Sequence, residues 1–155
     1  MAFRLTGLDP AQFEHLYGLD DDALSAVGAR RYRVDKAPGF PDRIEMRDLE
    51  PGESAILLNH VHQPADTPYR ASHAIFVREG ARTAYAAIDR IPDVIRIRPI
   101  SLRAFDSAGE MVDADLVDGQ AIEGLIDRFL GNRVVSYLHA HYAKRGCYAA
   151  RIERA

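Results

Sequence analysis

Short runs of hydrophobic residues, separated by proline, glycine and charged residues, dominate the chain and predict strands. The strongest run, residues 54–62 (SAILLNHVH), lies between the Pro51-Gly52 turn and Pro64. Runs of this length between turn-forming residues are typical of β-strands. Further strands are predicted at residues 3–8, 31–34, 72–78, 100–105, 111–117, 134–142 and 147–153, with a weaker edge strand at 43–47.

One helix stands out, at residues 120–130. Its hydrophobic residues recur at i, i+3, i+4, i+7 and i+8, with Asp118 as a candidate cap and Gly131 as the stop. This spacing places the hydrophobic side chains on one face, as in a helix that packs on a core. The sequence therefore predicts an amphipathic helix in this segment.

Two shorter helices are predicted near the N-terminus. Asp9 and Pro10 begin one that extends to about residue 17, and the acidic residues 20–22 begin another that Gly28 ends. Residues 94–98 suit either a helix or a strand. About seven strands with hairpin-length links and few intervening helices argue against βαβ units. We expect an α+β fold: a single domain over residues 1–155, with a largely antiparallel β-sheet and about three helices packed on it.

Composition excludes several function classes. The 155 residues are 47% hydrophobic and 28% charged, which is ordinary for a globular domain. A net charge of −3 argues against nucleic-acid binding driven by phosphate neutralisation. The single cysteine excludes an intrachain disulfide, and no signal peptide or long apolar run is visible. We expect a cytoplasmic protein with neither a nucleic-acid nor a membrane partner, and we predict no cofactor.

Five of the six histidines fall in predicted strands, in the segments NHVHQ, ASHAIFV and YLHAHY. Residues two apart on a strand share a face, so each His-x-His pair projects two imidazoles from one surface. His62 and His141 are the candidate metal ligands, because imidazole suits transition metals. No Asp or Glu at a defined ligand spacing accompanies them. The alternative is that these histidines are strand-end side chains hydrogen-bonded to neighbours.

Cys147 is a candidate nucleophile, with Lys144 and Arg145 just before it. A histidine base would come from the adjacent strand, at His139 or His141. Geometry adds a condition, because residues directly opposite each other in an antiparallel pair share a face. A closing loop with an even number of residues places Cys147 on the face opposite these histidines, whereas an odd loop or a bulge brings them together. The alternative is an inert, half-buried cysteine.

A third set of side chains suits anion binding. Guanidinium groups hold carboxylate or phosphate with paired hydrogen bonds, and loops on a rigid sheet commonly carry binding groups. The alternative is that each is a solvated surface residue. The candidate anion-binding residues are Lys36, Arg43, Tyr69, Arg70 and Lys144.

Three long segments make the chain similar to a bacterial family known as domain of unknown function 1203. They are PGFPDR (38–43), EPGESAILLNHVHQPADTPYRASHAIFVRE (50–79) and LHAHYAKRGCYAARIERA (138–155), and RAFD and MVDADLVDG add to the likeness. The resemblance covers essentially the whole chain but implies no established activity. At Asp42 the chain departs from the family pattern, which has cysteine there, so a mechanism that needs a cysteine pair is not expected.

These observations lead to one main hypothesis and two alternatives. The main hypothesis is a pocket that binds a small anionic molecule through Arg43 and Arg70. If turnover occurs there, His73 or His139 would be the general base and Cys147 the nucleophile. The alternatives are a non-catalytic homodimeric module and a metal-binding protein that uses the His-x-His pairs. The sequence does not decide whether the protein is an enzyme.

Overall fold

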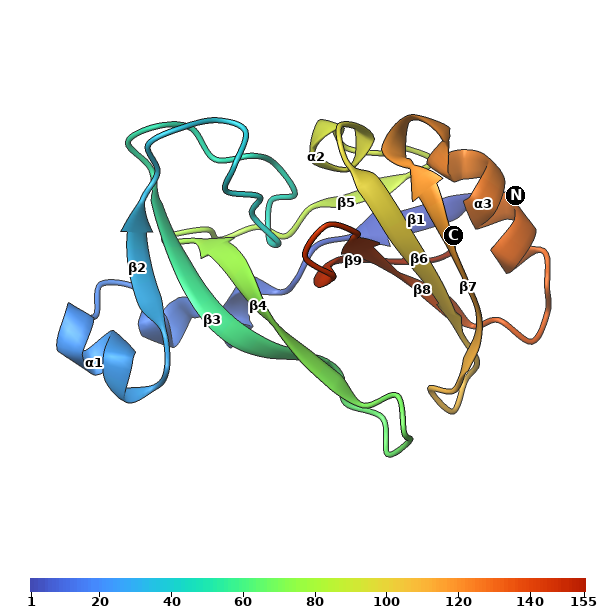
Figure 1. Cartoon of the computed structure of the whole chain (residues 1–155), viewed down its shortest axis with the longest axis horizontal. Helices are drawn as coiled ribbons and strands as arrows, with labels where there is room; N and C mark the ends of the chain where they lie inside the picture. The colour runs from blue at the N-terminus through green and yellow to red at the C-terminus, as the bar shows by residue number, and fades with distance from the viewer.

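Nine strands, all paired antiparallel, form two sheets in the computed structural model, which describes residues 1–155. The two sheets lie beside each other (Figure 1), and the predicted α+β fold class is confirmed. The larger sheet has the order β5-β1-β9-β8-β6-β7, with β1 (Phe3–Thr6), β5 (Ala86–Ile88), β6 (Pro99–Phe105), β7 (Met111–Asp118), β8 (Tyr137–Tyr142) and β9 (Cys147–Arg154). The smaller sheet has the order β2-β3-β4, with β2 (Arg30–Arg33), β3 (Ser54–Gln63) and β4 (Ala71–Arg78).

Three α-helices accompany the sheets: α1 (Asp21–Ala26), α2 (Asp93–Arg96) and α3 (Ile122–Leu130). The stripe predicted on α3 is buried, and the Asp118 side chain accepts a hydrogen bond from the Gln120 N–H just before the helix. The short 3₁₀ turn η3 (Gly119–Ala121) leads into α3. None of the helices combines the length and the apolar character that crossing a membrane requires.

Two expectations about local structure are wrong. Residues 10–16 form two 3₁₀ turns, η1 (Pro10–Gln12) and η2 (Glu14–Leu16), because their N–H groups bond three residues back. Residues 43–47 form no strand. The Asp42 carboxylate accepts the Glu45 N–H, and Met46 has a φ of 56°, so the backbone turns back on itself.

Successive side chains of β8 point alternately to the two faces of the larger sheet, so its hydrophobic residues and its histidines lie on opposite faces. Leu138, Ala140 and Tyr142 point into the larger core, which packs β8 and β9 against α3. His139 and His141 therefore point from the opposite face of the sheet, toward β3 and β4. A second core lies beneath the smaller sheet, η1 and η2. The site thus lies between the sheets rather than in either core.

Candidate metal centre

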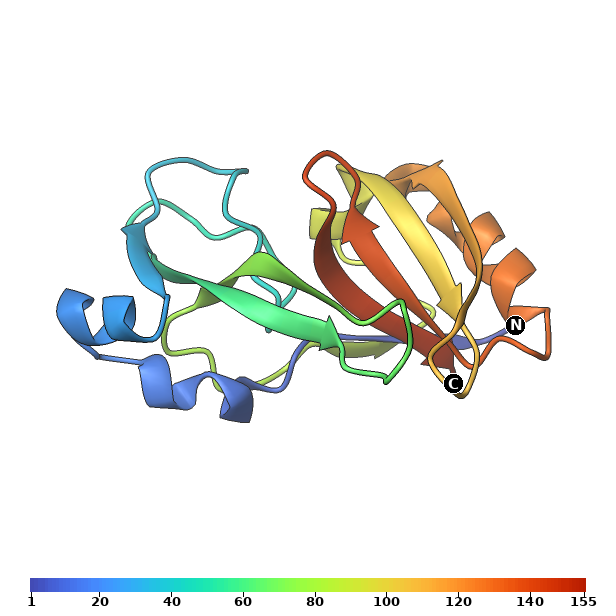
Figure 2. The same ribbon diagram turned by 60° about the horizontal axis from the view of Figure 1, so that its bottom comes forward.

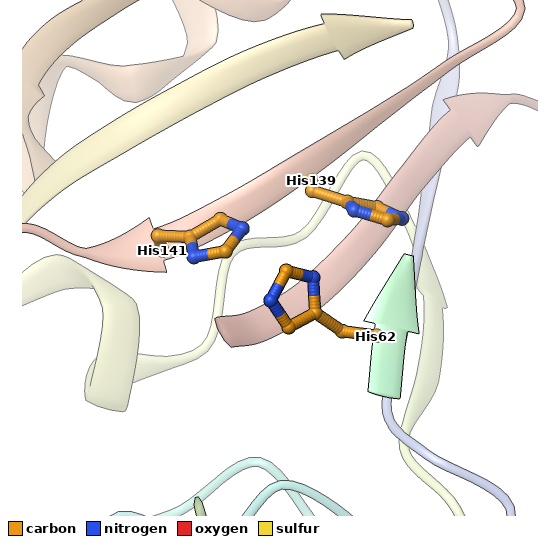
Figure 3. A group of neighbouring side chains, drawn as sticks. All are labelled: His62, His139 and His141. Carbon is orange, nitrogen blue, oxygen red and sulfur yellow. The ribbon is translucent and has the colours of Figure 1, made fainter. Parts of the chain in front are cut away.

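Three histidines from the two sheets meet in the space between them. His139 and His141 project from β8, and His62 projects from the end of β3 (Figure 3). His139 and His141 are almost fully buried, at 3% and 1% exposure, and His62 is half-buried. One ring nitrogen from each histidine lies within 4.8 Å of the corresponding nitrogens of the other two. We refer to His62, His139 and His141 as the histidine triad.

Each histidine of the triad has one buried ring nitrogen that bonds to no protein group. These atoms are His62 Nδ1, His139 Nδ1 and His141 Nε2. The other ring nitrogen of His141, Nδ1, lies 2.8 Å from the Gly146 carbonyl oxygen. Since a carbonyl only accepts, Nδ1 carries the proton and Nε2 presents its lone pair. The β8–β9 turn therefore fixes the tautomer of His141.

Burial keeps the triad uncharged at neutral pH. Loss of hydration lowers the pKa of His62 to about 4 and the pKa values of His139 and His141 to about 3. Burial is the largest cause for each pKa, and neighbouring imidazoles and the Arg103 guanidinium act in the same direction, together with Arg151 at His139. At His141 the hydrogen bond to Gly146 opposes them. Neutral imidazoles retain the lone pairs that a metal ion or a proton donor needs.

Tyr148 is the aromatic wall of this site. Its ring stacks on His62 at 5.3 Å between centroids and meets His139 and His141 edge-on, at 5.1 and 5.7 Å. The four-residue β8–β9 loop pairs Tyr142 with Cys147 and so places Tyr148 directly opposite His141. The ring limits the movement of all three imidazoles and shields one side of the triad from water.

A pocket of about 290 Å³ opens beside the triad. His62 and His139 line it together with Gln63, Tyr137 and Arg151. Gln63 Nε2 donates to the Tyr137 hydroxyl at 2.9 Å, and the Arg151 guanidinium lies 4.1 Å from the Tyr137 ring centroid. The site thus combines three neutral imidazoles with a pocket that opens onto two of them, His62 and His139.

A second, larger cleft of about 700 Å³ holds most of the other predicted site residues. It lies between the loop that follows β2 and the β8–β9 turn, which face each other on the same side of the molecule (Figure 2). The predicted residues that line it are Lys36, Arg43, His73, Lys144 and Cys147. We refer to this cavity as the basic cleft.

Cys147 does not share a face with the histidines of β8. The closing loop has four residues, 143–146, and Cys147 is directly opposite Tyr142. The bulge between Ala140 and His141 lies farther along the pair and leaves this register unchanged. The even-loop condition therefore holds, and the pairing of Cys147 with His139 or His141 as nucleophile and base is not formed. Instead, Cys147 Sγ lies 3.0 Å from Arg43 Nη2.

Tyr69 and Arg70 lie apart from both cavities. They belong to the exposed loop between β3 and β4, where Arg70 Nη1 donates to the Pro64 carbonyl at 2.6 Å. Neither residue lines the pocket beside the triad or the basic cleft. Their closeness to His73 in sequence does not bring them into the basic cleft, which His73 lines.

Sequence reasoning missed Tyr148, Arg151 and Arg98 as site residues. Tyr148 lies opposite His141 in the register that the closing loop sets, whereas Arg151 lies opposite His139 because a bulge between Ala140 and His141 shifts the pairing. No local signal marks such a bulge in the sequence. Arg98 lines the basic cleft from the segment after α2, where the sequence did not even decide between helix and strand.

Comparisons with known proteins add one finding. No curated protein and no solved structure matches the chain. A family model described as "Protein of unknown function (DUF1203)" matches residues 39–154, a range that includes the whole histidine triad. The chain therefore belongs to the DUF1203 family.

Proposed function

We propose that this protein binds a divalent first-row transition metal ion, with zinc as the expected ion, through the histidine triad. The proposal rests on two observations: each of the three neighbouring histidines has a buried ring nitrogen without a protein partner, and one ring nitrogen of each lies within 4.8 Å of those of the other two. An unsatisfied buried polar atom costs about 1–3 kcal/mol. Three unsatisfied nitrogens in neighbouring histidines would therefore lower the stability of the fold by several times this amount. A metal ion bound by these nitrogens would satisfy all three.

The chemistry of the donors favours zinc or a related metal over magnesium and calcium. Three neutral imidazoles provide only nitrogen, whereas magnesium and calcium require oxygen ligands. Zinc sites with three protein ligands keep a fourth position for water or substrate. Zinc–nitrogen bonds of about 2.0–2.1 Å in a tetrahedral site separate the nitrogens by about 3.3–3.4 Å. The present separations, up to 4.8 Å, are within reach of small side-chain rotations.

The hydrogen bond made by the second ring nitrogen of His141 also supports the proposal. Metal-binding histidines typically donate their second ring N–H to a carbonyl or carboxylate, which fixes the orientation of the ring. The bond between His141 Nδ1 and the Gly146 carbonyl is of this kind. It directs the lone pair of Nε2 away from the turn and leaves that nitrogen available for a metal.

The pocket beside the triad indicates what the fourth ligand would be. No Asp or Glu lines the pocket, and its one cationic residue, Arg151, is paired with Glu153 at 3.3 Å. A metal ion held by three neutral ligands keeps its full charge. The fourth ligand would therefore be a small anion, such as hydroxide, a carboxylate or a phosphate, which would offset the charge of the metal.

The test is metal content and affinity in purified protein. We expect about one zinc or cobalt ion per chain by elemental analysis after reconstitution, and a visible cobalt absorption typical of tetrahedral nitrogen coordination. The variant His62→Gln should weaken zinc binding by more than about 100-fold, because losing a ligand exceeds the 10–100-fold cost of losing an outer partner. Competition with a coloured chelator measures this affinity.

His60→Gln is the matched control. His60 lies two residues earlier on β3 and packs against Phe13 and Tyr148, but it is not in the triad. Its zinc affinity should stay within about threefold of the parent protein, and circular dichroism would verify that both variants fold. Folded parent protein that takes up no zinc, cobalt, nickel or copper would refute the proposal. Equal affinities in the two variants would refute it as well.

A further inference from the structure

The basic cleft is lined by positive charge without any carboxylate. Five of its lining residues are cationic, and none is Asp or Glu. They come from three separate segments of the chain, which the fold brings to one cavity: Lys36, Arg43, Arg98, Lys144 and Arg145. Unbalanced charge of one sign in a concave site attracts ligands of the opposite sign.

Arg43 lies at the floor of this cleft and is 1% exposed. Its guanidinium donates to the carbonyls of Tyr148 and Pro41, at 2.8 and 2.5 Å, and approaches the Cys147 sulfur. No carboxylate pairs with it. A buried charge normally has a counter-ion. Two of the five N–H groups of the Arg43 guanidinium make no hydrogen bond and are available to an anionic ligand.

The Tyr142 hydroxyl is a second group in the cleft without a partner. Tyr142 is 5% exposed, and its hydroxyl oxygen is buried with no hydrogen bond. Its ring lies between two guanidiniums, 5.0 Å from Arg43 and 5.1 Å from Arg98. Arg98 is already paired with Asp48 at 2.6 Å. The Tyr142 hydroxyl, which has no partner, and the Arg43 guanidinium, which has no carboxylate partner, thus belong to neighbouring side chains that line the cleft, and each retains a group that can donate.

The opposite wall of the cleft is aromatic. The rings of Tyr32, Phe40 and Phe76 pack against one another with centroids 5.0–6.4 Å apart, and all three line the cavity. Lys36 and Lys144 are exposed residues that line the same cavity. A molecule that fits this cleft has an apolar, planar body on the aromatic wall and an anionic group at the basic wall.

We infer that the basic cleft is a binding site for a small amphipathic anion, with an aromatic or otherwise planar body and one carboxylate, sulfonate or phosphate group. Arg43 and the Tyr142 hydroxyl bind the anionic group from within, and the ammonium groups of Lys36 and Lys144 neutralise it from the rim. The site is separate from the histidine triad, none of whose members lines the cleft. Binding therefore requires no metal.

The test uses 8-anilinonaphthalene-1-sulfonate, which fluoresces when its rings leave water, and its uncharged analogue N-phenyl-1-naphthylamine. The folded parent protein should bind the sulfonate saturably at one site per chain, with and without prior treatment with EDTA. The double variant Lys36→Gln/Lys144→Gln should raise the dissociation constant of the sulfonate by about tenfold, since each exposed charge pair adds modestly. The difference in dissociation constant between the parent protein and this double variant should decrease as salt is added.

Arg82→Gln/Arg133→Gln is the control for net charge. Both arginines are exposed, line neither cavity and make no ion pair, so the dissociation constant should change less than twofold. Tyr142→Phe keeps the ring and removes only the hydroxyl, and it should weaken binding about fivefold. The inference is overturned if the uncharged analogue binds as tightly as the sulfonate. It is also overturned if the lysine variant and its control bind the sulfonate equally, or if no saturable binding occurs.

Discussion

At the scale of single residues, unpaired buried polar atoms occur at both proposed sites. Three imidazole nitrogens and one phenol oxygen are the buried side-chain atoms without a hydrogen-bond partner. Native proteins leave few such atoms, because each costs free energy that only a ligand, an ion or water recovers. All four belong to β3 or β8, the strands that face the space between the sheets or end beside it.

Glycine positions provide a residue-level test of the framework around α3. A Cβ at Gly119 would lie 2.0 Å from the Ile95 carbonyl oxygen and under 3 Å from two more carbonyl oxygens, whereas a Cβ at Gly124 meets nothing within 4 Å. Gly119→Ala should therefore lower the free energy of unfolding by about 1–3 kcal/mol. Gly124→Ala should raise it by about 0.5–1 kcal/mol, since alanine favours the helix.

Urea titrations followed by circular dichroism measure both changes. The two substitutions add the same methyl group only five positions apart, so each serves as the control for the other. No loss of stability in Gly119→Ala would contradict the close approach of η3 to the segment around α2, and a loss in Gly124→Ala would contradict the open surroundings of that helix position.

At the scale of elements, one carboxylate joins the end of β4 to three other segments. Glu79 accepts hydrogen bonds from Arg31 on β2, from the Ser54 hydroxyl on β3 and from the Gly18 N–H. The Arg31 hydrogen bonds, more than any other contact, lower the pKa of Glu79 to about 2 from its ordinary 4.5. The smaller sheet thus depends on an ionised Glu79.

Glu79→Gln should lower the free energy of unfolding at pH 7 by about 1.5–3 kcal/mol, the usual range for hydrogen bonds to charged groups. A carboxylate whose pKa is depressed on folding stabilises fully above its unfolded pKa, and this stability is lost as the pH falls toward its folded pKa. The difference between variant and parent should therefore be constant above about pH 5 and narrow between pH 4.5 and 2. Urea unfolding at pH 7, 4 and 3 measures it.

Glu110→Gln is the comparison for this pH series, because the Glu110 side chain is exposed and makes no ion pair. Its stability should stay close to that of the parent at every pH. A Glu79 effect that does not narrow at pH 3 would mean that the ionised carboxylate is not the source of the stability.

At the scale of the whole molecule, the smaller sheet is inserted in the chain between two strands of the larger sheet, β1 and β5. The chain leaves after β1, builds β2, β3 and β4, and returns to pair β5 with β1. The loop after β2 bonds to both crossing segments, through Leu8 N–H to the Arg43 carbonyl and Tyr85 N–H to the Ile44 carbonyl. Arg43 also donates to the Tyr148 carbonyl on β9. These bonds couple the two sheets.

We therefore expect one cooperative unfolding transition for residues 1–155. Scanning calorimetry should give an enthalpy of about 110 kcal/mol near 60 °C, from about 0.7 kcal/mol per residue. The calorimetric and van't Hoff enthalpies should agree. Two resolved transitions would show that the smaller sheet folds and melts as a separate unit.

Much of the local structure follows from local rules. Period-two alternation places His139 and His141 on one face of a strand, the stripe on α3 predicts its buried side, and the even closing loop places Cys147 on the other face of the sheet. These features depend only on backbone geometry within a few residues. The strand predicted at residues 43–47 does not form, because the hydrogen bond to the Asp42 carboxylate and the turn at Met46 override a weak alternation of hydrophobic and polar residues.

The sequence by itself determined which residues share a face, because side-chain direction repeats with the period of the backbone. Only the tertiary structure decided that His62 joins His139 and His141, that Arg43 is buried beneath Lys36 and Lys144, and that Tyr69 and Arg70 lie elsewhere. The physical reason is that these positions depend on how the two sheets pack against each other. That packing involves residues far apart in the chain, for which no local pattern exists.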